Sequence, residues 1–182
     1  SKLSDTYLFP WYNNVGLESQ LRFGNVGNAT TTVTITIGGI PQVPTYTLAP
    51  NESARAMFNN VDSGPVQVKS SGGVPIIASL RVNLKHHPTY SSYTEFLGLS
   101  GSSTVGTLYM FPWYNNVGLE SQLRFGNVGN ASTTVTITIG GVPQAQTYTL
   151  APSASARVMF NNVDSGPVVV QSSGGVPIIA SM

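Results

Sequence analysis

The 182-residue chain contains no cysteine, which excludes disulfide bonds, thiolate nucleophiles and thiolate metal sites. Charged residues are also scarce, at 8% of the chain against about 25% of an average soluble domain. Because the net charge is +1 and no basic run occurs, the sequence does not indicate nucleic acid as a partner. It also lacks an apolar run of the roughly 18 residues that a membrane-spanning helix needs. We therefore expect a β-rich chain that Ser, Thr, Asn and Gln keep in solution.

Histidine is nearly absent as well. His86 and His87 are the only two, and adjacent residues on a strand point to opposite faces, so they do not easily share one metal ion. The second half of the chain has no histidine, which excludes a duplicated Ser-His-Asp triad. We expect the two histidines, which precede Pro88, to form a turn.

Seven carboxylates are present, and only Glu18 and Asp62 recur, as Glu120 and Asp164. A glycosidase site needs two carboxylates that face one sugar, whereas Glu18 is predicted on the polar face of a strand and Asp62 in a turn. The Asn59–Gly64 loop offers oxygen ligands but a single carboxylate, which is poor for calcium. We therefore predict no catalytic residue, no metal site and no cofactor, and that the chain is not an enzyme.

One stretch of the chain occurs twice. Residues 7–80 match residues 109–182 at a constant offset of 102, and 11 of the 74 aligned positions differ, which leaves 63 identical. A fixed period indicates a repeat array. An active site is seldom duplicated so faithfully, whereas a building block often is. The repeat predicts two domains, residues 1–99 and residues 100–182.

Hydrophobic residues alternate with polar ones along short segments, which is typical of half-buried strands. Glycine- and proline-containing turns separate the segments, and no window has a helical period. Seven or eight short strands in each unit of ~100 residues predict an all-β fold of two tandem immunoglobulin-like β-sandwich repeats. The strands expected in the first unit are 7–11, 17–23, 32–37, 46–48, 54–58, 66–69, 76–85 and 90–97.

The second repeat stops at Met182, the equivalent of Leu80, and so lacks the hairpin expected over 81–99. That hairpin could complete repeat 1, or it could cross forward and complete repeat 2. In either case one unit is left short and is expected to recruit a strand from a neighbour. We therefore expect self-association into a homopolymer, or continuation of a longer repeat array, through contacts near 1–11 and 177–182.

Aromatic residues concentrate in Phe-Pro-Trp-Tyr, which occurs once in each repeat. The candidate residues are Trp11, Tyr12, Trp113 and Tyr114. They could belong to the core, to a subunit or domain interface, or to a platform that stacks on sugar rings. Two equivalent triplets, at Asn28 and Asn130, also fit the N-glycosylation pattern.

Three segments together resemble tandem β-sandwich repeats in extracellular proteins of Chloroflexi-like and actinobacterial organisms. The segment 24–37 begins with Gly-Asn-Val-Gly-Asn-Ala, and the segment 46–55 begins with Tyr-Thr-Leu-Ala-Pro. The segment 73–79 is Gly-Val-Pro-Ile-Ile-Ala-Ser. With their copies in the second repeat they extend the resemblance over nearly the whole chain. The resemblance implies an extracellular or cell-surface location and a structural or adhesive role, and it carries over no catalytic residue.

These observations predict a structural subunit or spacer of an extracellular filament or surface array. One alternative is a carbohydrate-binding adhesion module that uses the Trp and Tyr residues. Another is a non-catalytic accessory region of a large secreted enzyme.

Overall fold

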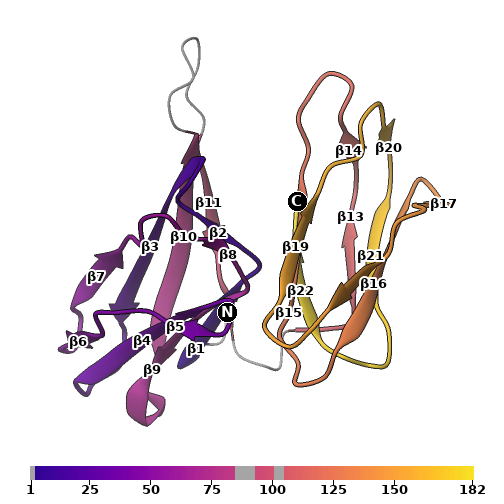
Figure 1. The fold of residues 1–182 in the computed structure, drawn as a ribbon. Helices are drawn as coiled ribbons and strands as arrows, with labels where there is room; N and C mark the ends of the chain where they lie inside the picture. The colour runs from indigo at the N-terminus through magenta and orange to yellow at the C-terminus, as the bar shows by residue number, and fades with distance from the viewer. Residues whose placement is uncertain (1–2, 85–92, 101–104) are drawn as a thin grey trace. The chain divides into compact units, whose positions relative to one another are not determined.

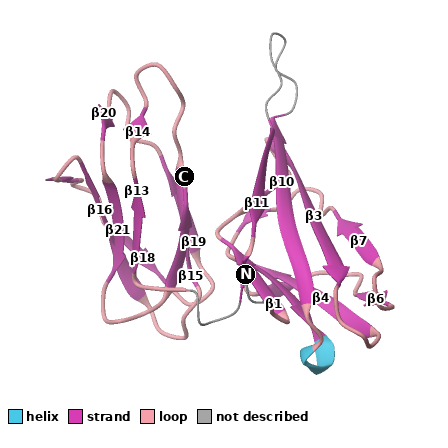
Figure 2. Cartoon of the chain, turned by 180° about the vertical axis from the view of Figure 1, so that it is seen from behind, coloured by secondary structure: helices cyan, strands magenta, loops and turns pink. Residues whose placement is uncertain are grey.

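The structure of the chain is a computed structural model that describes residues 3–84, 93–100 and 105–182. The chain divides into two compact units, unit 1 (Ser1–Thr104) and unit 2 (Val105–Met182), and each is described here by itself (Figure 1). Strands and loops make up almost all of the described residues. The 3₁₀ turn η1, Ser71–Gly73, is the one helical element among them and is cyan in Figure 2. The predicted all-β class with two similar units is confirmed.

Unit 1 consists of two main sheets and one short strand pair. The first sheet has the order β12-β1-β9-β4-β5, with β6 also paired to β4, and the second has the order β11-β10-β3-β7. Strand β2 pairs with β8. The bounds are β1 Thr6–Phe9, β2 Tyr12–Asn13, β3 Leu17–Asn25, β4 Thr31–Ile37, β5 Ile40–Pro41, β6 Tyr46–Leu48, β7 Ser53–Ala56, β8 Asp62–Ser63, β9 Val66–Ser70, β10 Ile76–Leu84, β11 Tyr93–Leu97 and β12 Leu99–Ser100.

Unit 2 repeats this arrangement. Its sheets have the orders β13-β21-β16-β17, with β18 also paired to β16, and β19-β15-β22, and β14 pairs with β20. The register repeats too: Val33 faces Ser70 in unit 1, and Val135 faces Ser172 in unit 2. The bounds are β13 Leu108–Phe111, β14 Tyr114–Asn115, β15 Leu123–Asn127, β16 Thr133–Ile139, β17 Val142–Pro143, β18 Tyr148–Leu150, β19 Ser155–Val158, β20 Asp164–Ser165, β21 Val168–Ser172 and β22 Ile178–Ser181.

The core of unit 1 lies between its two main sheets, which gives a sandwich-like architecture. In β4 the residues Val33, Ile35 and Ile37 are buried while Thr34 is exposed, as the period-two pattern predicts. Leu21 on β3 and Leu80 on β10 enter the same cluster from the other sheet. Full burial of one such side chain contributes about 1.5–3 kcal/mol, so this alternation is the main source of sheet-to-sheet cohesion.

The segment 93–100 closes one edge of unit 1 by passing from one sheet to the other. Strand β11 pairs with β10, where Phe96 faces Leu80, and β12 pairs with β1, where Leu99 faces Leu8. Of the two placements considered for the 81–99 hairpin, the structure has the one that completes repeat 1. The expected turn at 85–88 lies outside the described residues.

Gly98 marks the crossing between the sheets. Its N–H donates to the carbonyl oxygen of Ala78 (3.2 Å). A Cβ atom at this position would lie 2.8 Å from Cζ of Phe9 and 3.0 Å from Cβ of Tyr7. The absence of a side chain thus lets the segment lie directly on two core aromatic residues.

We expect Gly98→Ala to destabilise unit 1 by about 1–2 kcal/mol, because the added methyl group overpacks this contact. Hydrogen exchange read by mass spectrometry should show faster exchange in β1 and β10 and no change in unit 2. Gly16→Ala is the control, since a Cβ at Gly16 meets no atom within 4 Å. Equal exchange rates in the Gly98 and Gly16 variants would contradict the prediction.

Candidate functional site

The tyrosine of each Phe-Pro-Trp-Tyr segment lies in the core. The Tyr12 hydroxyl donates to the Ser19 carbonyl oxygen (2.9 Å) and accepts from the Phe58 N–H (2.8 Å). Tyr114 makes the equivalent bonds in unit 2 at the same distances. Both side chains are fully buried, and burial raises the pKa of each hydroxyl. Since neither ring reaches the surface, Tyr12 and Tyr114 cannot form part of a sugar platform, and this part of the prediction is corrected.

The tryptophan that precedes each of these tyrosines lies at the surface of its unit. The Nε1–H of Trp113 donates to Oδ1 of Asp164 (2.8 Å), and the side chain is 55% exposed. Trp11 donates to Asp62 in the same manner (2.5 Å) and is half-buried. Asp62, expected in a turn, lies in β8 and is the acceptor for this indole. Each carboxylate therefore fixes the orientation of a surface tryptophan.

Repeated asparagines supply hydrogen bonds to the backbone. Oδ1 of Asn13 accepts from three successive N–H groups, those of Val15, Gly16 and Leu17 (3.0–3.1 Å). Asn25 is buried and bonds three backbone groups of its surroundings, as Asn127 does in unit 2. Sequence reasoning missed these networks. The available signal was the recurrence of asparagine two or three residues before glycine, in Asn-Asn-Val-Gly and Gly-Asn-Val-Gly-Asn.

The other candidate residues are not brought together. Asn28 and Asn130 are exposed in the loops that precede β4 and β16, and their glycosylation stays a prediction. In the Asn59–Gly64 loop the carboxylate of Asp62 is engaged by Trp11. Among residues 3–84, 93–100 and 105–182 no three His, Asp or Glu side chains are placed to hold a metal ion. His86 and His87 lie outside the described residues.

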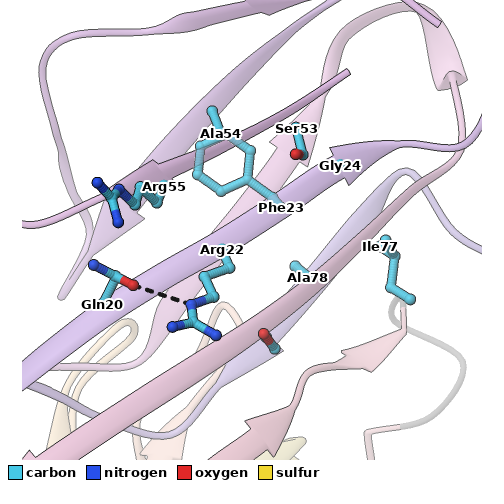
Figure 3. A pocket seen from close by; sticks show the side chains of 10 residues that line it. Gln20, Arg22, Phe23, Gly24, Ser53, Ala54, Arg55, Ile77 and Ala78 are labelled. Atoms are coloured by element: carbon cyan, nitrogen blue, oxygen red, sulfur yellow. Dashed lines mark hydrogen bonds between the residues drawn. The ribbon is translucent and has the colours of Figure 1, made fainter. Parts of the chain in front are cut away.

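A hollow of about 560 Å³ lies on β3, β7 and β10 of unit 1 (Figure 3). Arg22 of β3 is directly opposite Arg55 of β7 in the sheet register. Gly24, two residues further along β3, is opposite Ser53 on one side and Ile77 on the other. Gln20 Oε1 accepts from Arg22 Nε (3.0 Å), the dashed bond of Figure 3. The sequence pattern did not indicate this site.

No protein-family model matches the chain, and no curated protein matches it in sequence. Within the described residues, no helix is long and apolar enough to cross a membrane.

The described surface thus offers two groups of side chains that could bind a ligand. One is the surface tryptophan of each unit, Trp11 in unit 1 and Trp113 in unit 2, each bonded to a carboxylate. The other is the hollow on β3, β7 and β10, beside which Arg55 is exposed.

Proposed function

We propose that the chain is a structural subunit or spacer of an extracellular filament or surface array, built from immunoglobulin-like β-sandwich units. The observation that supports this most is that the two units have the same strand register and the same buried hydrogen bonds. Residues that recur in both repeats, such as Tyr12, Asn13 and Asn25, form hydrogen bonds to the backbone that stabilise the fold. A repeat array requires units that share one architecture. The resemblance to tandem repeats of surface proteins supports the location.

We further propose that units assemble by head-to-tail contacts or by strand donation. In unit 1 the outer edge of β1 is covered by β12, and Leu8 there is 7% exposed. Its equivalent on β13, Met110, is 65% exposed, and within residues 105–182 no strand pairs with that edge of β13. A strand added from a neighbour would bond these main-chain groups and cover the side chain. Such a contact is heterologous and can extend into a filament.

Electron microscopy of the producing cells, with gold-labelled antibodies against the chain, tests the function. We expect label along surface filaments or on a regular surface layer. Label confined to the cell interior would contradict the location. A purified chain that remains monomeric at high concentration in sedimentation experiments would contradict the proposed assembly.

A carbohydrate-binding module remains a second candidate function because Trp113 presents an exposed indole that Asp164 orients. Under this alternative, Trp113→Ala should weaken binding on a glycan array, and the Trp11→Ala, Trp113→Ala double variant should abolish it. Val117→Ala is the control, since Val117 is also an exposed hydrophobic residue of the same unit. Absence of any glycan signal for the unmodified chain would remove this candidate.

A further inference from the structure

Unit 2 presents two sheet edges whose equivalents in unit 1 are covered by one segment. This closing segment, residues 93–100, pairs with β10 through β11 and with β1 through β12. The equivalent strands of unit 2 are β22 and β13, and within residues 105–182 no further strand pairs with either of them on that side. An open edge presents a row of main-chain N–H and C=O groups to which another strand can pair.

Side chains beside these edges of unit 2 are less buried than their equivalents in unit 1. Met110 of β13 is 65% exposed, whereas its equivalent Leu8, directly opposite Leu99 of the closing segment, is 7% exposed. Ala180 of β22 is half-buried, whereas its equivalent Ala78 is 2% exposed. Since the residues of both pairs are hydrophobic, the difference in exposure reflects the lack of a covering segment in the described part of unit 2.

Two aromatic residues of unit 2 mark the place where such a segment passes from one sheet to the other. In unit 1 the crossing residue is Gly98, which lies directly on Tyr7 and Phe9. These two side chains are buried, whereas their equivalents in unit 2, Tyr109 and Phe111, are half-buried. A strand that crosses them in the same way needs a glycine at the closest approach, because a side chain there would overlap the rings.

Unit 1 contains a sequence that meets these requirements. Residues 96–99 are Phe-Leu-Gly-Leu, a pattern that occurs once in the chain and is held in unit 1. We propose that unit 2 binds the closing segment of a neighbouring chain of the array, one whose segment is not held in a unit of its own. The segment adds a strand to β13 and crosses to β22, with its glycine on Tyr109 and Phe111. This inference rests on the strand donation proposed above and names the donated strand.

The closing segment is favoured over a second copy of unit 2 that pairs edge to edge through β13. Such a pair adds a strand to one sheet only. It would cover Met110 but leave β22 open and the rings of Tyr109 and Phe111 half-buried. The closing segment covers both edges and the rings between them, and so removes more apolar surface from water.

Disulfide trapping on the full chain tests the position and the register of the donated strand. The chain has no cysteine, so Met110→Cys introduces its only thiol. The probe is a synthetic peptide of residues 93–100 with Leu99→Cys, because Leu99 is directly opposite Leu8, the equivalent of Met110. Opposite residues of antiparallel strands have Cα atoms about 4.5–5.5 Å apart, which a disulfide spans. In a glutathione redox buffer, intact-mass measurement should show the peptide adduct as the main product.

Val142→Cys is the matched control for the chain, since Val142 is 63% exposed on β17 of the same unit. We expect about tenfold more adduct at Met110→Cys than at Val142→Cys, because only the first thiol lies opposite the bound strand. A second peptide that also carries Gly98→Leu is the control for the probe. It should give about tenfold less adduct, because its side chain would overlap the rings of Tyr109 and Phe111.

Three results would each overturn the proposal: no adduct, equal adduct at Met110→Cys and Val142→Cys, or equal adduct with the two peptides. Disulfide-linked dimers of the Met110→Cys chain in place of the adduct would assign this edge to a second copy instead. Surface filaments in electron microscopy without a peptide adduct would overturn this inference alone and leave an array held by end-to-end packing. A specific adduct without filaments would support the donated strand and contradict the array.

Discussion

Gly64→Ala should destabilise unit 1 by about 3 kcal/mol or more, an exceptional cost for the addition of one methyl group. A Cβ at Gly64 would overlap the carbonyl oxygen of Pro10 and lie 2.9 Å from Cα of Trp11. These are backbone atoms, which cannot rotate away as the end of a side chain can. The only relief is a displacement of the segment that links β1 to β2, which carries the indole bonded to Asp62.

The chain contains two tryptophans, one in each unit, so the effect can be assigned. In a Trp113→Phe background, urea unfolding followed by tryptophan fluorescence reports on unit 1 alone. Gly64→Ala should lower the midpoint strongly, while Gly16→Ala, which meets no atom within 4 Å, should leave it nearly unchanged. In the converse Trp11→Phe background, which reports on unit 2, Gly166→Ala should also lower the midpoint, because the added Cβ would lie 3.0 Å from Cα of Trp113. A midpoint for Gly64→Ala equal to that of the Gly16 control would refute the overlap.

Local patterns in the sequence predict most strands because the period of two is read from neighbours. The strand predicted over 46–48 is β6 itself, and 32–37 differs from β4 by one residue. Two of the predicted strands extend further than the observed ones, for different reasons. Strand 7–11 breaks at Pro10, which has no N–H to donate, so β1 ends at Phe9. Strand 54–58 stops at Ala56, since the N–H of Phe58 bonds the Tyr12 hydroxyl rather than a neighbouring strand.

The candidate sites depend even more on distant pairing. Arg22 and Arg55 are 33 residues apart, and they become neighbours only through the register of β3 against β7. A shift of one residue would turn either side chain to the opposite face, and nothing in the local pattern of β7 specifies its partner. The role of Tyr12 has the same cause, because its two bonding partners come from separate parts of the chain. Sequence reasoning could therefore locate the aromatic cluster but could not separate its buried tyrosines from its outward tryptophans.

Asn25→Ala should destabilise unit 1 by about 3 kcal/mol, because three backbone groups lose their partner in a site that is 1% exposed. Nδ2 of Asn25 donates to the carbonyl oxygens of Ala29 (2.8 Å) and Leu48 (3.1 Å), and Oδ1 accepts from the N–H of Gly27 (2.9 Å). Urea unfolding in the Trp113→Phe background measures the change. Asn28→Ala is the control and should have little effect, since Asn28 is exposed in the loop that follows β3.

Asn25→Asp makes the same network depend on pH. A carboxylate there would keep the acceptor for Gly27 but turn a negative oxygen toward the carbonyl groups of Ala29 and Leu48. Burial and these carbonyls raise the pKa of the new carboxyl above the value of about 3.9 that it has when unfolded. Between the pKa of the unfolded state and the higher pKa of the folded state, the folded state binds more protons than the unfolded state. The stability of the variant therefore falls as the pH rises through this range. We expect the variant to approach the stability of the unmodified chain near pH 4 and to lose it toward pH 7. A stability difference between Asn25→Asp and the unmodified chain that is constant from pH 4 to pH 7 would show that Nδ2 is not the donor that holds this loop to β6.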